Sequence, residues 1–185
     1  MTEIHRYALI QRLLHWLIAF LVLLALGMGM TLGFLGFEGS QETFGKAMTA
    51  ALYTGHKTFG VMILALMLLR LGIRLLLGAP PYPSPLSGFE QVASRTVHSL
   101  LYVVLLAQPI LGWLATAAGG YPVQFFAWNL PGLIGKDTTL SETLFSLHGV
   151  VGWILVGLLV LHMGGALRHG LIQRDGVMTR MSLFR

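Results

Sequence analysis

The chain has 185 residues, and only 10% of them are charged, whereas water-soluble domains carry roughly 25%. With 55% hydrophobic residues and a mean hydropathy of +0.75, it has too few polar side chains to cover a soluble surface. This composition excludes a soluble enzyme and a disordered tail, and the net charge of +5, distributed over separate loops, argues against a nucleic-acid partner.

Four apolar stretches follow one another along the chain, each near the roughly 20 residues that a helix needs to cross about 30 Å of hydrocarbon. They lie at about residues 9–35, 52–77, 96–118 and 143–167. Because no backbone group can stay unpaired in lipid, each stretch is predicted to be a helix. The predicted fold class is all-α: residues 1–185 form one integral membrane domain, a four-helix bundle.

The first two stretches carry basic residues near their ends. Arg6 and Arg12 precede the first apolar run, as in a secretory signal, but the run is too long and lacks a convincing small-x-small cleavage site. We therefore interpret it as a membrane helix. In the second stretch Lys57, Arg70 and Arg74 can extend to the two interfaces while the apolar middle crosses the bilayer.

The connecting segments are short. The proline-rich segment 79–85 cannot be helical and is predicted to run as an extended strap. Segment 119–143 contains Phe125, Phe126 and Trp128 and is predicted to lie along the membrane interface. Its last part, Thr139-Leu140-Ser141-Glu142, has the form of a capping box at the start of the fourth helix.

The basic residues predict the orientation, because cytoplasmic loops carry an excess of Lys and Arg. Nine of the twelve fall in the amino terminus, the middle loop with its flanks, and the tail: Arg6, Arg12, Arg70, Arg74, Arg95, Arg168, Arg174, Arg180 and Arg185. The other two loops hold Lys46, Lys57 and Lys136. Both termini are therefore predicted to be cytoplasmic, in a multi-pass protein of the bacterial inner membrane.

The chain has seven histidines and no cysteine, so thiolate sites are excluded and imidazole is the remaining nitrogen ligand. His5 and His169 fall outside the spans beside arginines, and we expect both to be solvated. The other five, inside or at the ends of spans, need a functional explanation: His15, His56, His98, His148 and His162.

Four of these histidines can form two pairs. His148 and His162 are 14 residues apart, which is close to four helical turns, so they share a face and lie about 21 Å apart along the axis. His56 begins the second span at the depth of His148, and His15 begins the first at the depth of His162. The sequence therefore predicts two stacked sites with two imidazoles each.

Two imidazoles facing each other across a bundle core are the arrangement that holds a haem iron from both sides. A metal transporter would need carboxylates or thiolates nearby, and a proton relay would need acids within the spans, which this sequence lacks. We interpret His15, His56, His148 and His162 as haem ligands; other buried polar contacts or a different metal are the alternatives.

Small residues follow each of these histidines by one turn, and they could leave room for a flat haem. Gly60 follows His56, Gly152 follows His148, and alanines follow the other two. The alternative is ordinary close packing between membrane helices.

Four further residues have two interpretations each. Arg70 and Arg74 share a helix face and either anchor the helix at the interface or neutralise haem propionates. Lys57 has the same two readings at the other end of the span and could also attract an anionic substrate. Tyr102 follows His98 by one turn, which argues that His98 is no axial ligand. His98 could bond a propionate or a quinone carbonyl, or only pack between helices.

An ordered set of motifs covers nearly the whole chain. It comprises Arg12-Leu13-Leu14-His15-Trp16, Gly55-His56-Lys57-Thr58-Phe59-Gly60, the proline-rich strap, His98-Ser99-Leu100-Leu101-Tyr102 with Pro109 and Gly112, and the His148 to His162 spacing. In these features the chain resembles the bacterial cytochrome b561 family, di-haem four-helix proteins related to the cytochrome b subunits of nickel-iron hydrogenases.

The resemblance implies two haem b groups, ligated by His15, His56, His148 and His162, that carry electrons between ubiquinone and another partner. Free-standing members resemble superoxide oxidases, which pass an electron from periplasmic superoxide to ubiquinone; others are haem-bearing anchors of a hydrogenase or dehydrogenase. No side chain need act as nucleophile or general base. A small metal or proton transporter or sensor is the alternative from another class, and the oligomeric state is left open.

Overall fold

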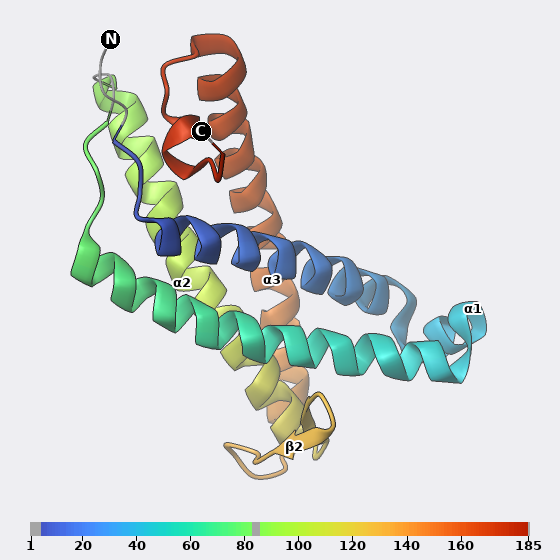
Figure 1. Ribbon diagram of the computed structural model, residues 1–185. Helices are drawn as coiled ribbons and strands as arrows, with labels where there is room; N and C mark the ends of the chain where they lie inside the picture. Colours follow the sequence, from blue (N-terminus) through green and yellow to red (C-terminus); the bar gives the residue numbers. More distant parts are fainter. Residues whose placement is uncertain (1–4, 83–85, 185) are drawn as a thin grey trace.

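The computed structural model describes residues 5–82 and 86–184, and this part of the chain is mostly helical (Figure 1). Three helices are long and apolar enough to span a membrane. The elements in chain order are α1 (Leu9–Leu77), α2 (Gly88–Ala118), β1 (Val123–Phe125), β2 (Trp128–Leu130), α3 (Thr138–Leu167), a π-helical turn η1 (Arg168–Gln173) and a 3-10 turn η2 (Met178–Met181).

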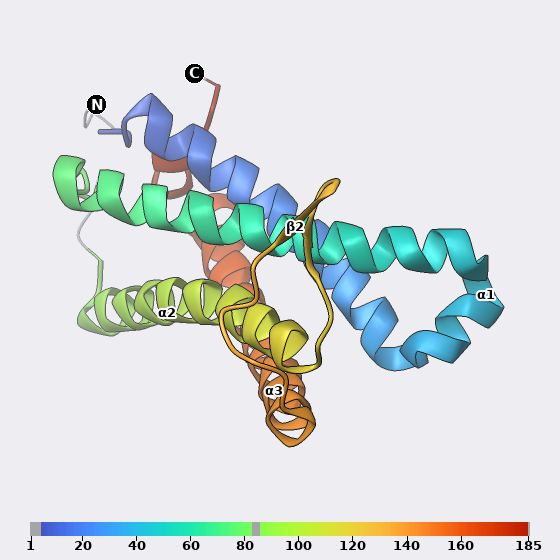
Figure 2. The ribbon, with the colours of Figure 1, turned by 90° about the horizontal axis from the view of Figure 1, so that it is seen from below.

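Helix α1 has 69 residues and would be about 100 Å long if it were straight, far more than a bilayer is thick. It is interrupted at Gly36 and Gly45, whose φ angles of 67° and 79° lie in the left-handed region that glycine adopts without strain. The chain therefore folds back on itself, and Figures 1 and 2 show two long arms side by side. We call residues 9–35 the first arm and residues 46–77 the second arm.

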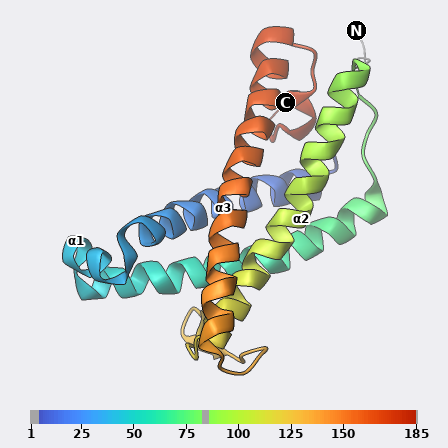
Figure 3. The same ribbon diagram turned by 180° about the vertical axis from the view of Figure 1, so that it is seen from behind.

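The helices form two layers. The arms of α1 make one layer and the antiparallel helices α2 and α3 make the other, and the two layers cross at an angle (Figures 1 and 3). Aliphatic side chains of all four segments meet at the crossing and are buried there: Leu14, Ile18, Leu21, Val22, Ala25, Ile63, Met67, Leu101, Val104, Leu155 and Leu158. The crossing is therefore the core of the molecule.

Helices α2 and α3 begin earlier than the apolar runs predict. Helix α2 starts at Gly88, eight residues before the predicted start, because Ser87 and Glu90 form a capping box: Glu90 N donates to Ser87 Oγ at 3.3 Å, and Ser87 N donates to Glu90 Oε2 at 3.0 Å. The capping box predicted at residues 139–142 is wrong. Asp137 caps α3 instead, its carboxylate accepting from Leu140 N at 3.0 Å.

A small β-hairpin occupies the middle of the segment between α2 and α3. Strands β1 and β2 are antiparallel, with Val123 opposite Leu130 and Phe125 opposite Trp128. The hairpin is fastened to the second arm of α1, since Phe126 N donates to Thr58 Oγ1 at 3.0 Å. The sequence predicted an interfacial segment here but no strands.

The two ends of the chain lie at the same end of the molecule, opposite the β-hairpin (Figure 1). We call residues 178–184 the C-terminal tail. The tail crosses the start of the first arm: Tyr7 N donates to Arg180 O at 3.2 Å, Arg12 Nη1 to Ser182 O at 2.7 Å and Trp16 Nε1 to Met181 O at 2.8 Å. Of the proline-rich strap, residues 79–82 form no regular element and residues 83–85 lie outside the described part.

Candidate functional site

Four half-buried histidines meet in two pairs between α1 and α3. His56 from the second arm faces His148, with ring centres 6.0 Å apart and ring planes at 83°. His15 from the first arm faces His162, with ring centres 6.0 Å apart and planes at 79°. We call these the hairpin-end pair and the tail-end pair. The sequence predicted the same two partnerships, and the role of the four residues as iron ligands stays a prediction.

The separation of the rings suits one iron between each pair. An imidazole–metal bond is about 2 Å long and each ring centre lies about 1 Å behind its nitrogen, so two rings that hold one metal from opposite sides stand about 6 Å apart. Both observed separations agree with this distance. The described residues contain no group of three or more His, Cys, Asp or Glu side chains that could hold a metal ion. A metal ion without a porphyrin would therefore find only two imidazole ligands at each pair.

Backbone carbonyls orient both rings of the hairpin-end pair. His56 Nδ1 lies 2.9 Å from Ala25 O, and His148 Nδ1 lies 3.1 Å from Gln108 O. A carbonyl oxygen can only accept, so Nδ1 carries the proton in both rings and Nε2 keeps its lone pair. Metal-ligating histidines have this same arrangement, which fixes the tautomer and the direction of the ring. The donor set therefore fits a haem.

Gln108 contacts His148 twice. Its backbone carbonyl accepts from the ring, and its side-chain Nε2 donates to His148 O at 2.9 Å. The following residue, Pro109, lies inside α2 and has no N–H to donate, which loosens the helix at this turn. The two bonds between Gln108 and His148 hold the first half of α3 against α2 at the level of the hairpin-end pair.

The tail-end pair has different surroundings. Among the residues that the structure describes, no hydrogen bond reaches a ring nitrogen of His15 or His162. A third imidazole, His98 from α2, stands with its ring centre 5.1 Å from that of His162, and its Nδ1 lies 2.6 Å from Ser94 O. The sequence predicted that His98 bonds a propionate or a quinone, or only packs between helices. The structure places it beside the tail-end pair.

The arginines predicted to neutralise propionates lie near the tail-end pair. Arg70 Nη1 donates to Gln11 O at 3.1 Å, one turn before His15 on the first arm. Arg74 lies with its guanidinium 5.7 Å from the ring centre of Tyr7, and its Nη1 is buried without a hydrogen-bond partner in the described chain. Both side chains are therefore available for a carboxylate at this end.

Lys57 is less available than the sequence suggested. Its Nζ donates to Pro122 O at 3.1 Å and to Gln124 Oε1 at 3.3 Å, so the amine is tied to the segment that carries the β-hairpin. The two glycines also differ. A Cβ at Gly60 would meet nothing within 4 Å, whereas a Cβ at Gly152 would lie 3.3 Å from Gln108 Nε2. Open space therefore remains at Gly60, while the space at Gly152 is used by Gln108.

His169 is not solvated, so the expectation for this residue is wrong. Its Nδ1 lies 2.6 Å from Asp175 Oδ2, and the two side chains are only 14% and 15% exposed. The turn of η1 brings the two residues together, which hydropathy could not indicate. His5 is exposed, as expected.

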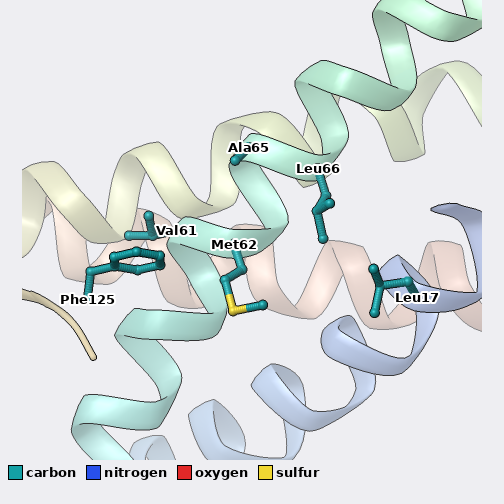
Figure 4. Close-up of a pocket in the computed structure, with 6 residues that line it drawn as sticks. All are labelled: Leu17, Val61, Met62, Ala65, Leu66 and Phe125. Atoms are coloured by element: carbon teal, nitrogen blue, oxygen red, sulfur yellow. The ribbon is translucent and has the colours of Figure 1, made fainter. Parts of the chain in front are cut away.

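An apolar pocket of about 270 Å³ opens between the two arms of α1, away from both histidine pairs. Figure 4 shows Phe125 of β1 beside Val61 at one end and Leu17 of the first arm at the other. The remaining lining residues are Met62, Ala65 and Leu66. None of these side chains can donate a hydrogen bond, so the pocket suits a hydrocarbon chain and not a polar head group.

Sequence reasoning missed three residues that support the site. Gln108 contacts the backbone of His148, Gly29 lies against the ring of His56, and Arg180 of the C-terminal tail contacts Pro80 O. A glycine within an apolar helix is a possible signal, because it lowers helix propensity and needs a reason. Arg180 has no such signal, since its partners Tyr7 and Tyr82 are distant in the sequence.

Comparison with known proteins agrees with these observations. Residues 6–182 match the family described as prokaryotic cytochrome b561. Cytochrome b561 homolog 2 of Escherichia coli is 32% identical over 181 residues, which are 95% of this chain and 90% of that protein. Cytochrome b561 homolog 1 of the same organism is 28% identical over 68% of this chain and 72% of its own length. A probable superoxide oxidase of Yersinia pestis is 27% identical over 95% of each chain.

Proposed function

Since this chain belongs to the prokaryotic cytochrome b561 family, we propose that it carries two haem b groups, one at each histidine pair, and moves electrons across the membrane between them. Membership of this family shows that the protein is an integral, multi-pass inner-membrane protein that transfers electrons and binds haem b. The number of haems, their positions and their partners are the proposal.

The repeated geometry of the two pairs carries the proposal. Each pair has ring centres 6.0 Å apart and nearly perpendicular rings, and in each pair one ring comes from α1 and one from α3. The two α3 ligands are 14 residues apart, so the pairs lie about 21 Å apart along that helix. Two like sites at different depths are what a path for electrons across a bilayer requires.

We further propose four crossings of the membrane, with each arm of α1 spanning once and both termini in the cytoplasm. The position of both chain ends at one end of the molecule supports an even number of crossings (Figure 1). The excess of arginine at that end supports the orientation. The hairpin-end pair is then periplasmic and the tail-end pair cytoplasmic.

The protein's own residues would orient and neutralise the bound groups. A bound haem supplies an iron that accepts and releases one electron. His15 with His162 and His56 with His148 would hold the two groups, and this ligation by two imidazoles each would suit electron transfer. Arg70 and Arg74 would balance the carboxylates of a tail-end haem.

For the electron donor and acceptor we propose superoxide at the periplasmic face and ubiquinone. The probable superoxide oxidase of Yersinia pestis, which aligns over nearly the whole chain, supports this pair of substrates. Stopped-flow mixing of the oxidised protein with superoxide should reduce the haem, and added ubiquinone should reoxidise it. A protein that contains haem but is not reduced by superoxide would contradict this part alone.

One observation favours a second candidate, a haem-bearing subunit that takes electrons from a periplasmic dehydrogenase. Lys57, one of three lysines on that side, is engaged with Pro122 and Gln124, and four acids lie in the same loops: Glu38, Glu42, Asp137 and Glu142. This surface attracts an anion weakly and suits a basic protein face. Co-purification with a large redox partner would favour this candidate.

The haem content tests the common part of both candidates. A pyridine haemochrome assay should give two haems per chain for the parent protein and one each for His148→Ala and His162→Ala, because each variant breaks one pair. The control is His5→Ala, which should keep two. A colourless parent protein whose dithionite-reduced spectrum lacks b-type bands would overturn the proposal and favour a metal or proton transporter or sensor.

A further inference from the structure

We propose that Gly29 and Gly112 are positioning residues: each uncovers a backbone carbonyl that accepts the Nδ1 proton of a hairpin-end ligand, and together they give the hairpin-end haem the lower reduction potential. This inference rests on the proposed haem ligation. It concerns the protein's own residues around His56 and His148 and assigns the two glycines a role that packing alone does not give them.

The same arrangement occurs at both hairpin-end ligands. His56 Nδ1 bonds to Ala25 O, and Gly29 follows Ala25 by four residues. His148 Nδ1 bonds to Gln108 O, and Gly112 follows Gln108 by four residues on a different helix. A carbonyl at one position and a glycine four residues later therefore recur on α1 and on α2.

Glycine is required because of where helical side chains point. A side chain leans back over the preceding turn, so the residue at i+4 covers the carbonyl of residue i. That carbonyl has a second lone pair beyond its helical bond, but only an uncovered one can accept from a neighbouring helix. A Cβ at Gly29 would lie 2.6 Å from Cε1 of His56, and a Cβ at Gly112 would lie 3.0 Å from Cε1 of His148.

Glycines elsewhere in α1 and in α3 show that this closeness is specific. A Cβ at Gly27, two residues before Gly29, would meet nothing within 4 Å, and the same holds at Gly157 on α3. Gly29 and Gly112 are thus in contact with ligand rings, while Gly27 and Gly157 have open space beside them.

The tail-end pair lacks such carbonyl bonds and has two arginines nearby, Arg70 and Arg74, whereas the cation at the hairpin end, Lys57, is tied to Pro122 O and Gln124 Oε1. No hydrogen bond reaches a ring nitrogen of His15 or His162 within the described chain, while Arg70 is held one turn from His15 by its bond to Gln11 O. A hydrogen bond from Nδ1 makes an imidazole a stronger electron donor to iron and stabilises the oxidised state. A nearby guanidinium stabilises the reduced state, because it favours the added electron. Both effects place the hairpin-end haem below the tail-end haem in potential.

The test is a redox titration of the purified two-haem protein, followed by visible absorption. Comparison of the parent with His148→Ala identifies the hairpin-end haem. This variant should lose the lower of the two potentials and keep the higher. Gly112→Ala and Gly29→Ala should then raise the lower potential or release that haem, with the larger effect at Gly29, and leave the higher potential in place. The matched controls Gly27→Ala and Gly157→Ala should change neither.

Each outcome decides the inference. Loss of the hairpin-end haem alone from Gly29→Ala, with helix content and the other haem retained, supports it as well as a shift does. Unchanged potentials in both glycine variants overturn the positioning role. If His148→Ala instead removes the higher potential, the order is wrong, and this measurement does not depend on the folding of the glycine variants. A parent protein without haem would overturn the proposed function and this inference with it, whereas unchanged potentials in the glycine variants of a two-haem protein would overturn this inference alone.

Discussion

The two ends of the molecule hold similar histidine pairs in different ways. At the hairpin end, His56 and His148 are fixed by backbone carbonyls of α1 and α2, and the β-hairpin lies over this end. At the tail end, His15 and His162 have no such bonds in the described chain and lie among His98 and arginines. The two pairs therefore share a ring separation of 6.0 Å and differ in their electronic environment.

The two ends are also covered by different segments of the chain. The hairpin belongs to the segment that joins α2 to α3 and is tied to the second arm by Thr58 and Lys57. The other end is closed by the C-terminal tail, which is held by bonds from Arg12 and Trp16 to its carbonyls. One closing segment joins two helices, whereas the other is held by side-chain bonds to its backbone carbonyls.

The largest expected effect comes from replacing the tail-end histidines one at a time. His15→Phe should remove the tail-end haem and leave one haem per chain, while His98→Phe should keep both, because the ring centres of His98 and His162 stand 5.1 Å apart, less than the about 6 Å of two rings that hold one iron. The pyridine haemochrome assay on both variants measures this.

The reverse result would change the assignment. His98 stands closer to His162 than His15 does, with ring centres at 5.1 Å against 6.0 Å. If His98→Phe lost a haem and His15→Phe kept two, His98 would be the ligand opposite His162. The comparison of the two ends would then rest on a different residue. The matched hairpin-end variant, His56→Phe, should lose one haem in either case.

An intermediate effect is expected from the seal at the tail end. Arg180 is only 4% exposed, donates to Pro80 O, and lies with its guanidinium 5.1 Å from the ring centre of Tyr7 and 4.2 Å from that of Tyr82. Arg180→Ala removes a charged hydrogen bond and two cation–π contacts, so the free energy of unfolding should fall by about 2–4 kcal/mol. Unfolding in mixed micelles measures this.

Limited proteolysis separates a local effect from a global one. Cleavage near the C-terminal tail should become faster in Arg180→Ala, while the absorption of the hairpin-end haem stays as in the parent. Arg174→Ala is the control, because Arg174 is exposed and donates only to the nearby Leu171 O at 3.3 Å. Equal destabilisation by both substitutions would mean that the tail does not seal this end.

Much of the helical framework could be predicted from hydropathy. The apolar runs end near Leu77, Ala118 and Leu167, where the helices end, because lipid requires backbone hydrogen bonds to be made within each segment. The meeting of His148 with His56 could also be predicted, since depth and helical face follow from residue spacing. Their role as ligands remains a prediction.

Other features depend on contacts that residue spacing does not contain. The start of α3 is set by Asp137, whose carboxylate accepts from Leu140 N, and not by the capping box predicted at residues 139–142. The carbonyls of Ala25 and Gln108 belong to the backbone and leave no trace in the side-chain pattern. Only the glycines four residues later mark them, and those glycines have the alternative explanation of helix packing.

The smallest expected effect distinguishes the backbone of Gln108 from its side chain. Gln108→Leu removes the bond from Nε2 to His148 O, worth about 1 kcal/mol. It also removes Oε1, which is buried without a partner in the described chain, so part of this loss is offset and the net change should stay within about 1 kcal/mol. The carbonyl that accepts from His148 Nδ1 is present in every residue type. The potential of the hairpin-end haem should therefore not move in Gln108→Leu, whereas Gly112→Ala should raise it. If redox titration showed equal shifts in the two variants, packing around His148 would set the potential and the uncovered carbonyl would not.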